Sequence, residues 1–316
     1  MKIAFVFPGQ GSQEVGMGRA LREASAGAAE IWSEADAALG FALSRLCFEG
    51  PADELALTAN TQPAVLTASV AAAAALAERG LRPDLAAGHS LGEYSALVVA
   101  GALSFADAVR LVRQRGLFMQ EAVPVGVGAM AALLGVDVAT ADEVCGETAQ
   151  GEVVGVANIN APGQVVIAGH RAAVERAVKA AAARGGRRSV MLPVSAPFHS
   201  SLMKPAADRL ATELNGLRVA APRLPVVRNV DAGLTLRADE VKPFLVQQVA
   251  SPVRWTDCVE RLAREGATVF LEVGPGRVLT GLLKRTLPEA RGQAVEDPAS
   301  LEKALALAAG SEGAQP

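Results

Sequence analysis

Short apolar runs alternate with longer helical segments over the first part of the chain. Ile3 to Phe7 is a β-rich run closed by Pro8-Gly9, typical of a buried strand followed by a tight loop. After a stretch of helical composition up to about residue 40, the pattern predicts a buried helix, a short strand and two helices, at 64–79, 85–87, 93–103 and 106–121. Alternating strands and helices indicate a parallel sheet with helical crossovers.

The rhythm changes between residues 126 and 194. Strands are predicted at 129–136, 153–158, 164–168 and 189–194, with helices at 139–149 and 172–183. This βαββαβ order is that of the ferredoxin-like unit. Prolines and glycines mark both of its borders, so we expect a small ferredoxin-like domain at 125–195, inserted into a discontinuous α/β domain formed by 1–124 and 196–316.

In the large domain the alternation resumes after the insert. Strands at 225–230 and 267–273 are the clearest of this part, and the tail beyond Ala309 is expected to be frayed.

Composition excludes several classes of protein. The 316 residues are 51% hydrophobic and 20% charged, with a net charge of −3 and the basic residues spread along the chain, so no nucleic-acid-binding stripe is visible. The longest apolar runs, 64–77 and 123–136, are shorter than the roughly 20 residues of a membrane span. Cys47, Cys145 and Cys258 are far apart and lack CxxC spacing, which argues against disulfides and zinc. A cytoplasmic protein without a membrane or nucleic-acid partner is expected.

A candidate nucleophile lies in Gly88-His89-Ser90-Leu91-Gly92, which matches GxSxG. The motif follows a predicted strand and precedes a predicted helix, where a sharp turn exposes the serine hydroxyl, as in α/β-hydrolase-like folds. A chain with 31 glycines can also produce this pattern by chance. The context favours Ser90 as a nucleophile.

A serine nucleophile needs a base, and the chain has three histidines. His89 adjoins the serine and is expected to point away from it, and His170 closes a strand of the predicted insert. His199 lies where the chain returns from the insert to the large domain, a border that would place it at a cleft. A histidine satisfied in the core is the alternative for His199.

Two further features bear on the site. The Gly9-Gln10-Gly11 loop after the first strand leaves the Gln10 N–H free to approach an anion, so Gln10 and Leu91 are candidate oxyanion-hole donors. Arg113 and Arg115 share a predicted helix with Arg110, and a two-residue step turns them to opposite sides. An arginine on the inner side would need a carboxylate partner.

Five motifs taken in order resemble those of the malonyl-CoA:acyl-carrier-protein transacylases of fatty-acid synthesis, over nearly the whole length. They are Pro8-Gly9-Gln10-Gly11-Ser12-Gln13, Gly88-His89-Ser90-Leu91-Gly92-Glu93-Tyr94-Ser95-Ala96, Arg113-Gln114-Arg115-Gly116, Pro197-Phe198-His199-Ser200 and Glu272-Val273-Gly274-Pro275-Gly276. The resemblance implies a malonyl-serine intermediate on Ser90, formed from malonyl-CoA and discharged to the phosphopantetheine thiol of acyl carrier protein.

The resemblance also assigns roles to single residues. His199 would act as base and then as acid, with its other nitrogen held by the backbone carbonyl of Gln248. The N–H groups of Gln10 and Leu91 match the family's oxyanion hole, and Arg115 matches the arginine that holds the malonyl carboxylate. Two positions near the family's pocket match Gln62 and Asn158.

The resemblance implies two partners, malonyl-CoA as substrate and acyl carrier protein, and no bound cofactor. Three alternatives remain open: a serine thioesterase or esterase, a discrete acyltransferase serving a polyketide synthase, and a non-catalytic homologue that serves as an assembly partner.

Overall fold

The larger of two β-sheets forms the centre of the molecule. The computed structural model describes residues 1–310. Five parallel strands and one antiparallel edge strand, β8, lie in the order β10-β9-β1-β2-β7-β8. Their bounds are Lys2–Phe7 (β1), Leu85–Gly88 (β2), Val226–Val227 (β7), Leu234–Thr235 (β8), Ala267–Val273 (β9) and Arg291–Val295 (β10).

Strand β1 shows how both faces of this sheet are buried. Ile3, Phe5 and Phe7 belong to one hydrophobic core, and the alternate residues Ala4 and Val6 belong to another. Since successive side chains of a strand point to opposite faces, the sheet separates two layers of helices.

The helices divide between these two layers. Helices α12 (Trp255–Arg264) and α13 (Val278–Thr286) cover the face of Ala4 and Val6. The other layer contains α1 (Arg19–Ala24), α2 (Ala26–Leu39), α3 (Leu43–Glu49), α4 (Ala52–Ala56), α5 (Thr58–Glu78), α6 (Gly92–Val99), α7 (Phe105–Glu121), α10 (Lys204–Asn215), α11 (Ala238–Val249) and α14 (Pro298–Ala308).

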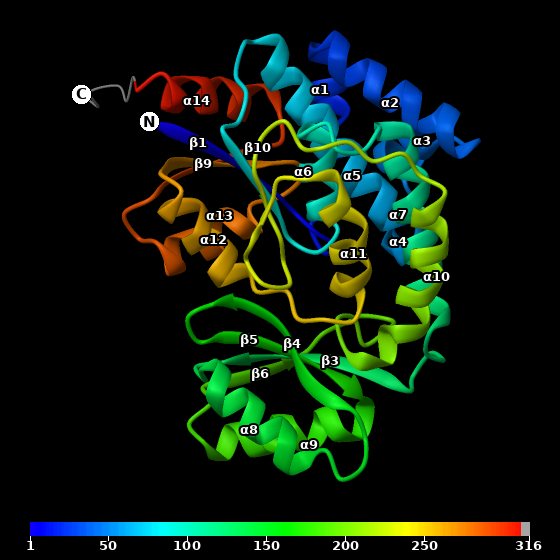
Figure 1. Cartoon of the computed structure of the whole chain (residues 1–316), viewed down its shortest axis with the longest axis vertical. Helices are drawn as coiled ribbons and strands as arrows, with labels where there is room; N and C mark the ends of the chain where they lie inside the picture. Colours follow the sequence, from blue (N-terminus) through cyan, green and yellow to red (C-terminus); the bar gives the residue numbers. More distant parts are fainter. Residues whose placement is uncertain (311–316) are drawn as a thin grey trace.

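A second sheet is built from residues between the two parts of the chain that form the first (Figure 1). Its four antiparallel strands lie in the order β4-β5-β3-β6. Helices α8 and α9 cover its outer face, and the opposite face turns toward the larger sheet (Figure 1). The bounds are Gly128–Leu134 (β3), Val138–Thr148 (α8), Val154–Ala161 (β4), Gln164–His170 (β5), Arg171–Ala183 (α9) and Arg188–Met191 (β6).

Alternation along β3 explains how this small sheet joins the rest. Ala129, Ala131 and Leu133 pack with α8 and α9. Met130 instead belongs to the hydrophobic core that also contains Ile3, Phe5 and Phe7 of β1. The single-residue alternation therefore directs one face to the local helices and one face to the rest of the molecule.

The structure confirms the predicted order of elements and corrects several ends. Helix α6 stops at Val99 and not at 103, because Gly101 has a φ of +75° and turns the chain. Strand β6 stops at Met191, since Pro193 has no N–H to continue the ladder. Strand β7 is only two residues long, because the chain turns back after Arg228. Helix α14 ends at Ala308, and most of the tail expected to be frayed lies outside the described residues.

Within residues 1–310, no helix combines the length and the apolar character that crossing a bilayer would require.

Candidate active site

Ser90 lies on a sharp turn between β2 and α6. Its φ of +52° is in the left-handed region, which is strained for a residue other than glycine. A Cβ added to Gly88 would lie 1.8 Å from the carbonyl carbon of Gly92, and one added to Gly92 would lie 2.1 Å from the Phe7 carbonyl oxygen. Gly88 therefore lets the turn close against the start of α6, and Gly92 lets it pack against the end of β1.

The amide of Asn229 fixes this turn from the neighbouring strand. Its Oδ1 accepts from the Ser90 N–H at 2.7 Å, and its Nδ2 donates to the Gly88 carbonyl at 2.7 Å. Asn229 follows β7, which pairs in parallel with β2, so the carboxyl ends of the two strands meet at one edge of the sheet. The side chain thus holds the strained backbone on both sides of His89.

His199 contacts the serine hydroxyl. Its Nε2 lies 2.7 Å from Ser90 Oγ, and its Nδ1 lies 3.0 Å from the Gln248 carbonyl oxygen. A carbonyl can only accept, so in the neutral ring Nδ1 carries the proton and Nε2 accepts from the serine O–H. This is the geometry of a serine nucleophile and its base.

Burial keeps His199 neutral. Removal from water and, second, the positive charge of Arg115 lower the pKa of His199 to about 3. The ring is therefore unprotonated at neutral pH and able to accept a proton.

Arg115 completes the polar centre. Its side chain is buried, with Nη1 donating to Gln62 Oε1 at 2.7 Å and Nη2 to Gln248 Oε1 at 3.0 Å and Ser90 Oγ at 3.1 Å. Helices α5 and α7 bring it there by packing side by side, and a Cβ on Gly116 would lie 2.7 Å from the Thr58 carbonyl oxygen. The glycine after Arg115 permits this close approach.

The carboxylate partner expected for an inward-facing arginine does not come from the described part of the chain in the case of Arg115. Within residues 1–310 it forms no ion pair, and its Nε has no hydrogen-bond partner. Neutral amide oxygens and the Tyr94 ring, 5.4 Å from the guanidinium carbon, surround it instead. Removal from water lowers the pKa of Arg115. The site thus has a buried cation whose charge is open to an anionic ligand.

A cavity of about 490 Å³ gives access to these groups. Gln10, Leu91 and Asn158 line it together with Ser90. Met130 and Asn158 of the small sheet also line it, together with Leu192, Pro193 and Val194 from the segment that follows β6. The side chain of Gln10 donates to Thr58 Oγ1 at 3.1 Å.

The other two histidines and the other two arginines named from the sequence do not contact the serine hydroxyl, although His89 also lines the cavity. His89 Nε2 lies 2.9 Å from Asn160 Oδ1, on the other side of the turn, and His170 Nδ1 accepts from the Val153 N–H. Arg113 donates to Asn60, and Arg110 donates to the Ala38 carbonyl. None of these four side chains contacts Ser90 Oγ within the described residues.

Two buried residues of the site were not assigned a role from the sequence. Asn229 is completely buried, and Glu93 is almost so. Burial raises the pKa of Glu93 to about 7. Hydrogen bonds from Gln248 and Asn229 lower this pKa, but their effect is smaller than that of burial. A polar residue near the carboxyl end of a predicted strand was the available signal for Asn229, and an acid in the first turn after GxSxG was the signal for Glu93.

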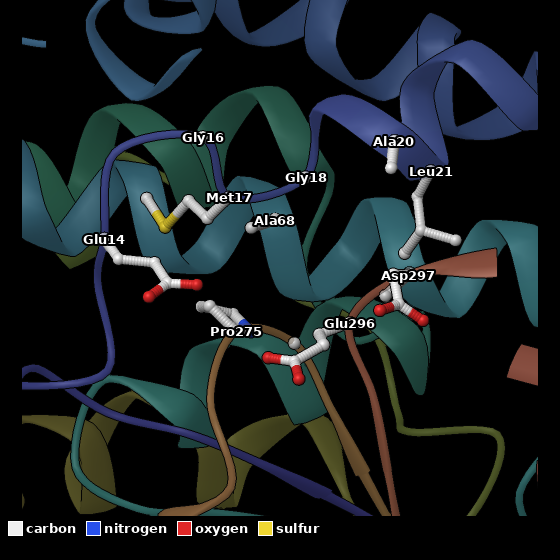
Figure 2. A pocket seen from close by; sticks show the side chains of 12 residues that line it. Glu14, Gly16, Met17, Gly18, Ala20, Leu21, Ala68, Pro275, Glu296 and Asp297 are labelled. Atoms are coloured by element: carbon white, nitrogen blue, oxygen red, sulfur yellow. The ribbon is translucent and has the colours of Figure 1, made fainter. Parts of the chain in front are cut away.

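A second hollow shares no lining residue with this cavity. It measures about 210 Å³ and lies between α1, α5 and the loop containing Gly274-Pro275 (Figure 2). Two of its acidic side chains have structural partners: Glu296 binds Arg277 and the Gly276 N–H, and Asp297 caps α14. Among the described residues, no group of three or more metal-ligating side chains was found.

Comparisons with known proteins agree with this geometry. The acyl transferase domain family matches residues 4–304, so the chain has the fold and sequence of an acyltransferase. It is 52% identical to the malonyl CoA-acyl carrier protein transacylase of Escherichia coli, over 97% of this chain and 99% of that protein. The enzyme of the same name from Bacillus subtilis is 49% identical, with 96% of each chain covered. The chain belongs to the malonyl CoA-acyl carrier protein transacylase family.

Solved structures give the same result. An acyl-carrier-protein S-malonyltransferase from Burkholderia pseudomallei is 53% identical and superposes with a TM-score of 0.94, over 96% of this chain and 99% of that one. A chain of the complex between a type II polyketide synthase acyl-carrier protein and its malonyl-transacylase also matches. That chain is 50% identical, with a TM-score of 0.94 and the same coverage.

Proposed function

We propose that the protein transfers the malonyl group from malonyl-CoA to the phosphopantetheine thiol of acyl carrier protein, supplying fatty-acid synthesis. The observation that carries the proposal is Arg115, a buried cation without an ion-pair partner in the described chain, 3.1 Å from the hydroxyl of Ser90. A short acyl group that ends in a carboxylate suits this arrangement, because a guanidinium binds a carboxylate with two parallel hydrogen bonds.

In the first half-reaction His199 Nε2 takes the Ser90 proton while Oγ attacks the thioester carbon. The negative charge that develops on the carbonyl oxygen is assigned to the N–H groups of Gln10 and Leu91, which line the cavity. As the C–S bond breaks, His199 returns the proton to the CoA sulfur. The malonyl group is then an ester of Ser90.

The second half-reaction runs the same steps with the carrier thiol. His199 takes the thiol proton, the sulfur attacks the malonyl ester, and the proton passes back to Ser90 Oγ as the ester bond breaks. The Gln248 carbonyl holds Nδ1 in the same tautomer throughout, in the role an aspartate has in a triad. Gln62 orients Arg115, and Asn158 contributes to the wall that faces the acyl group. No bound cofactor enters this chemistry.

We also propose a division of the chain into two domains, based on the order of the strands. Residues 125–195 are assigned as an inserted ferredoxin-like domain, and 1–124 with 196–316 as an α/β-hydrolase-like domain. The antiparallel order β4-β5-β3-β6 with two helices on one face supports the first assignment. The serine on a strand–turn–helix supports the second.

Intact-mass spectrometry after mixing with malonyl-CoA tests the proposal. We expect a gain of one malonyl group that acyl carrier protein removes within the assay and that buffer alone does not. Rapid loss in buffer would indicate a thioesterase or esterase. Absence of any adduct would leave a non-catalytic assembly partner.

The lowered pKa of His199 leads to a prediction on pH. A base must be neutral, and a pKa of about 3 keeps His199 neutral from pH 8 down to pH 5. The rate of Ser90 acylation by acetyl-CoA, which has no carboxylate for Arg115 to bind, is measured by rapid quench and mass spectrometry and should therefore stay within about twofold over this range. A tenfold fall between pH 7 and pH 5 would show an ordinary histidine pKa and contradict the assignment.

The polyketide alternative concerns the carrier and not the chemistry. The matched complex with a type II polyketide synthase acyl-carrier protein supports keeping it as a second candidate. Comparing the rate of malonyl transfer to a fatty-acid carrier protein and to a polyketide carrier protein distinguishes the two. We also propose a cytoplasmic location, with which the three free, buried cysteines agree.

A further inference from the structure

Glu93 is a buried carboxylate that does not touch the reacting atoms. It lies in the first turn of α6, 3% exposed. One of its oxygens, Oε2, accepts from Gln248 Nε2 at 2.8 Å and from the Asn229 N–H at 3.0 Å. Both partners in turn contact the turn that carries Ser90.

The side-chain amide of Gln248 links this carboxylate to Arg115. Its Nε2 also donates to the Ser90 carbonyl at 2.9 Å, and its Oε1 accepts from Arg115 Nη2 at 3.0 Å. The ionised Glu93 carboxylate and the Ser90 carbonyl only accept hydrogen bonds and Arg115 only donates, so these partners together fix the amide with nitrogen toward Glu93 and oxygen toward Arg115. The reversed amide would direct its N–H groups at the guanidinium.

We propose that Glu93 is a positioning residue for acyl selection: it fixes the orientation of the Gln248 amide, which holds the Arg115 guanidinium where the acyl carboxylate binds. The inference rests on the proposed malonyl transfer. It separates two tasks of Gln248, since the backbone carbonyl serves His199 and the side chain serves Arg115.

The test compares two substitutions of Glu93. Glu93→Leu removes both accepted hydrogen bonds and leaves the Ser90 carbonyl, with Asn229 Oδ1 at 3.3 Å, as the acceptors of Gln248 Nε2, so the amide is held less firmly. Glu93→Gln can place its amide oxygen at the Oε2 position and keep both bonds. Glu272→Leu is the matched control, because Glu272 is also a buried acid that accepts two backbone N–H groups, those of Leu279 and Thr280, away from the cavity.

The measured quantity is the ratio of Ser90 acylation rates with malonyl-CoA and acetyl-CoA, at pH 8 so that Glu93 is ionised. We expect Glu93→Leu to lower this ratio about tenfold and Glu93→Gln to change it less than about threefold. Glu272→Leu should leave the ratio unchanged, whatever it costs in stability. In the Arg115→Ala background, Glu93→Leu should produce no further change of the ratio.

Equal losses of both acylation rates in Glu93→Leu would show a merely structural role and overturn the proposal. If that variant does not fold by circular dichroism, Gln248→Leu is measured instead, since it removes the link and keeps the backbone carbonyl. An unchanged ratio in Gln248→Leu would overturn the proposal equally. Failure of the wild-type chain to form a malonyl adduct would count against the proposed function. It would not count against the positioning of Arg115 by Glu93 through the Gln248 amide.

Discussion

Replacing Ser90 with alanine is expected to abolish the malonyl adduct, with transfer to carrier protein falling at least about 10⁴-fold. The reason is that Ser90 Oγ is the hydroxyl held by both His199 Nε2 and Arg115 Nη2. Intact-mass spectrometry and a carrier-protein transfer assay measure the two effects. Thermal unfolding should change little, because the turn is held through the Ser90 backbone N–H and not through its hydroxyl.

Ser95→Ala is the matched control for this prediction. Ser95 is a buried serine in α6, and its hydroxyl has no hydrogen-bond partner among the described residues. We expect normal labelling of this variant. An adduct that survives in Ser90→Ala would move the nucleophile to another residue.

Replacing Arg115 with alanine is expected to lower the ratio of malonyl to acetyl acylation about 10- to 150-fold. The estimate takes the carboxylate to be bound by charged hydrogen bonds that contribute about 1.5 to 3 kcal/mol. With acetyl the arginine keeps the amide oxygens of Gln62 and Gln248, so it is not left wholly unpaired. The discrimination is thus smaller than for an arginine with no other partner.

Both rates are measured on the same variant, since Arg115 also contacts Ser90 Oγ and both will fall to some extent. Arg113→Ala is the control, because its guanidinium lies over the Phe41 ring and donates to Asn60, away from the serine. Equal losses for malonyl and acetyl in Arg115→Ala would refute the carboxylate-binding role.

The sequence predicted the order of elements because each element is encoded locally. The strand at 267–273 has the predicted bounds, and the βαββαβ segment has its predicted order. The ends of α6 and β7 could not be predicted from periodicity, since they depend on how the chain turns at Gly101 and after Arg228. Such turns are set by packing against other elements.

The contacts of the site are a different case. Ser90 and His199 are 109 residues apart, and they were paired by elimination among three histidines and by the resemblance to a family, not by any local pattern. Periodicity placed Arg115 and Arg113 on opposite sides of a helix, but it did not show which of the two faces inward. Glu93 lies in α6, Gln248 in α11 and Asn229 in the loop after β7. Because these segments are far apart in the sequence, no local pattern could have indicated the hydrogen bonds between them.

The small sheet has a consequence for how this enzyme could change. The nucleophile, its base, the arginine and the residues that hold them all lie outside 125–195, which contributes only one wall of the cavity. The chain enters and leaves this segment near Pro124 and Ser195. Substitutions among the cavity-lining residues of this segment should therefore act on the space left for the acyl group, while the contacts among Ser90, His199 and Arg115 stay as they are.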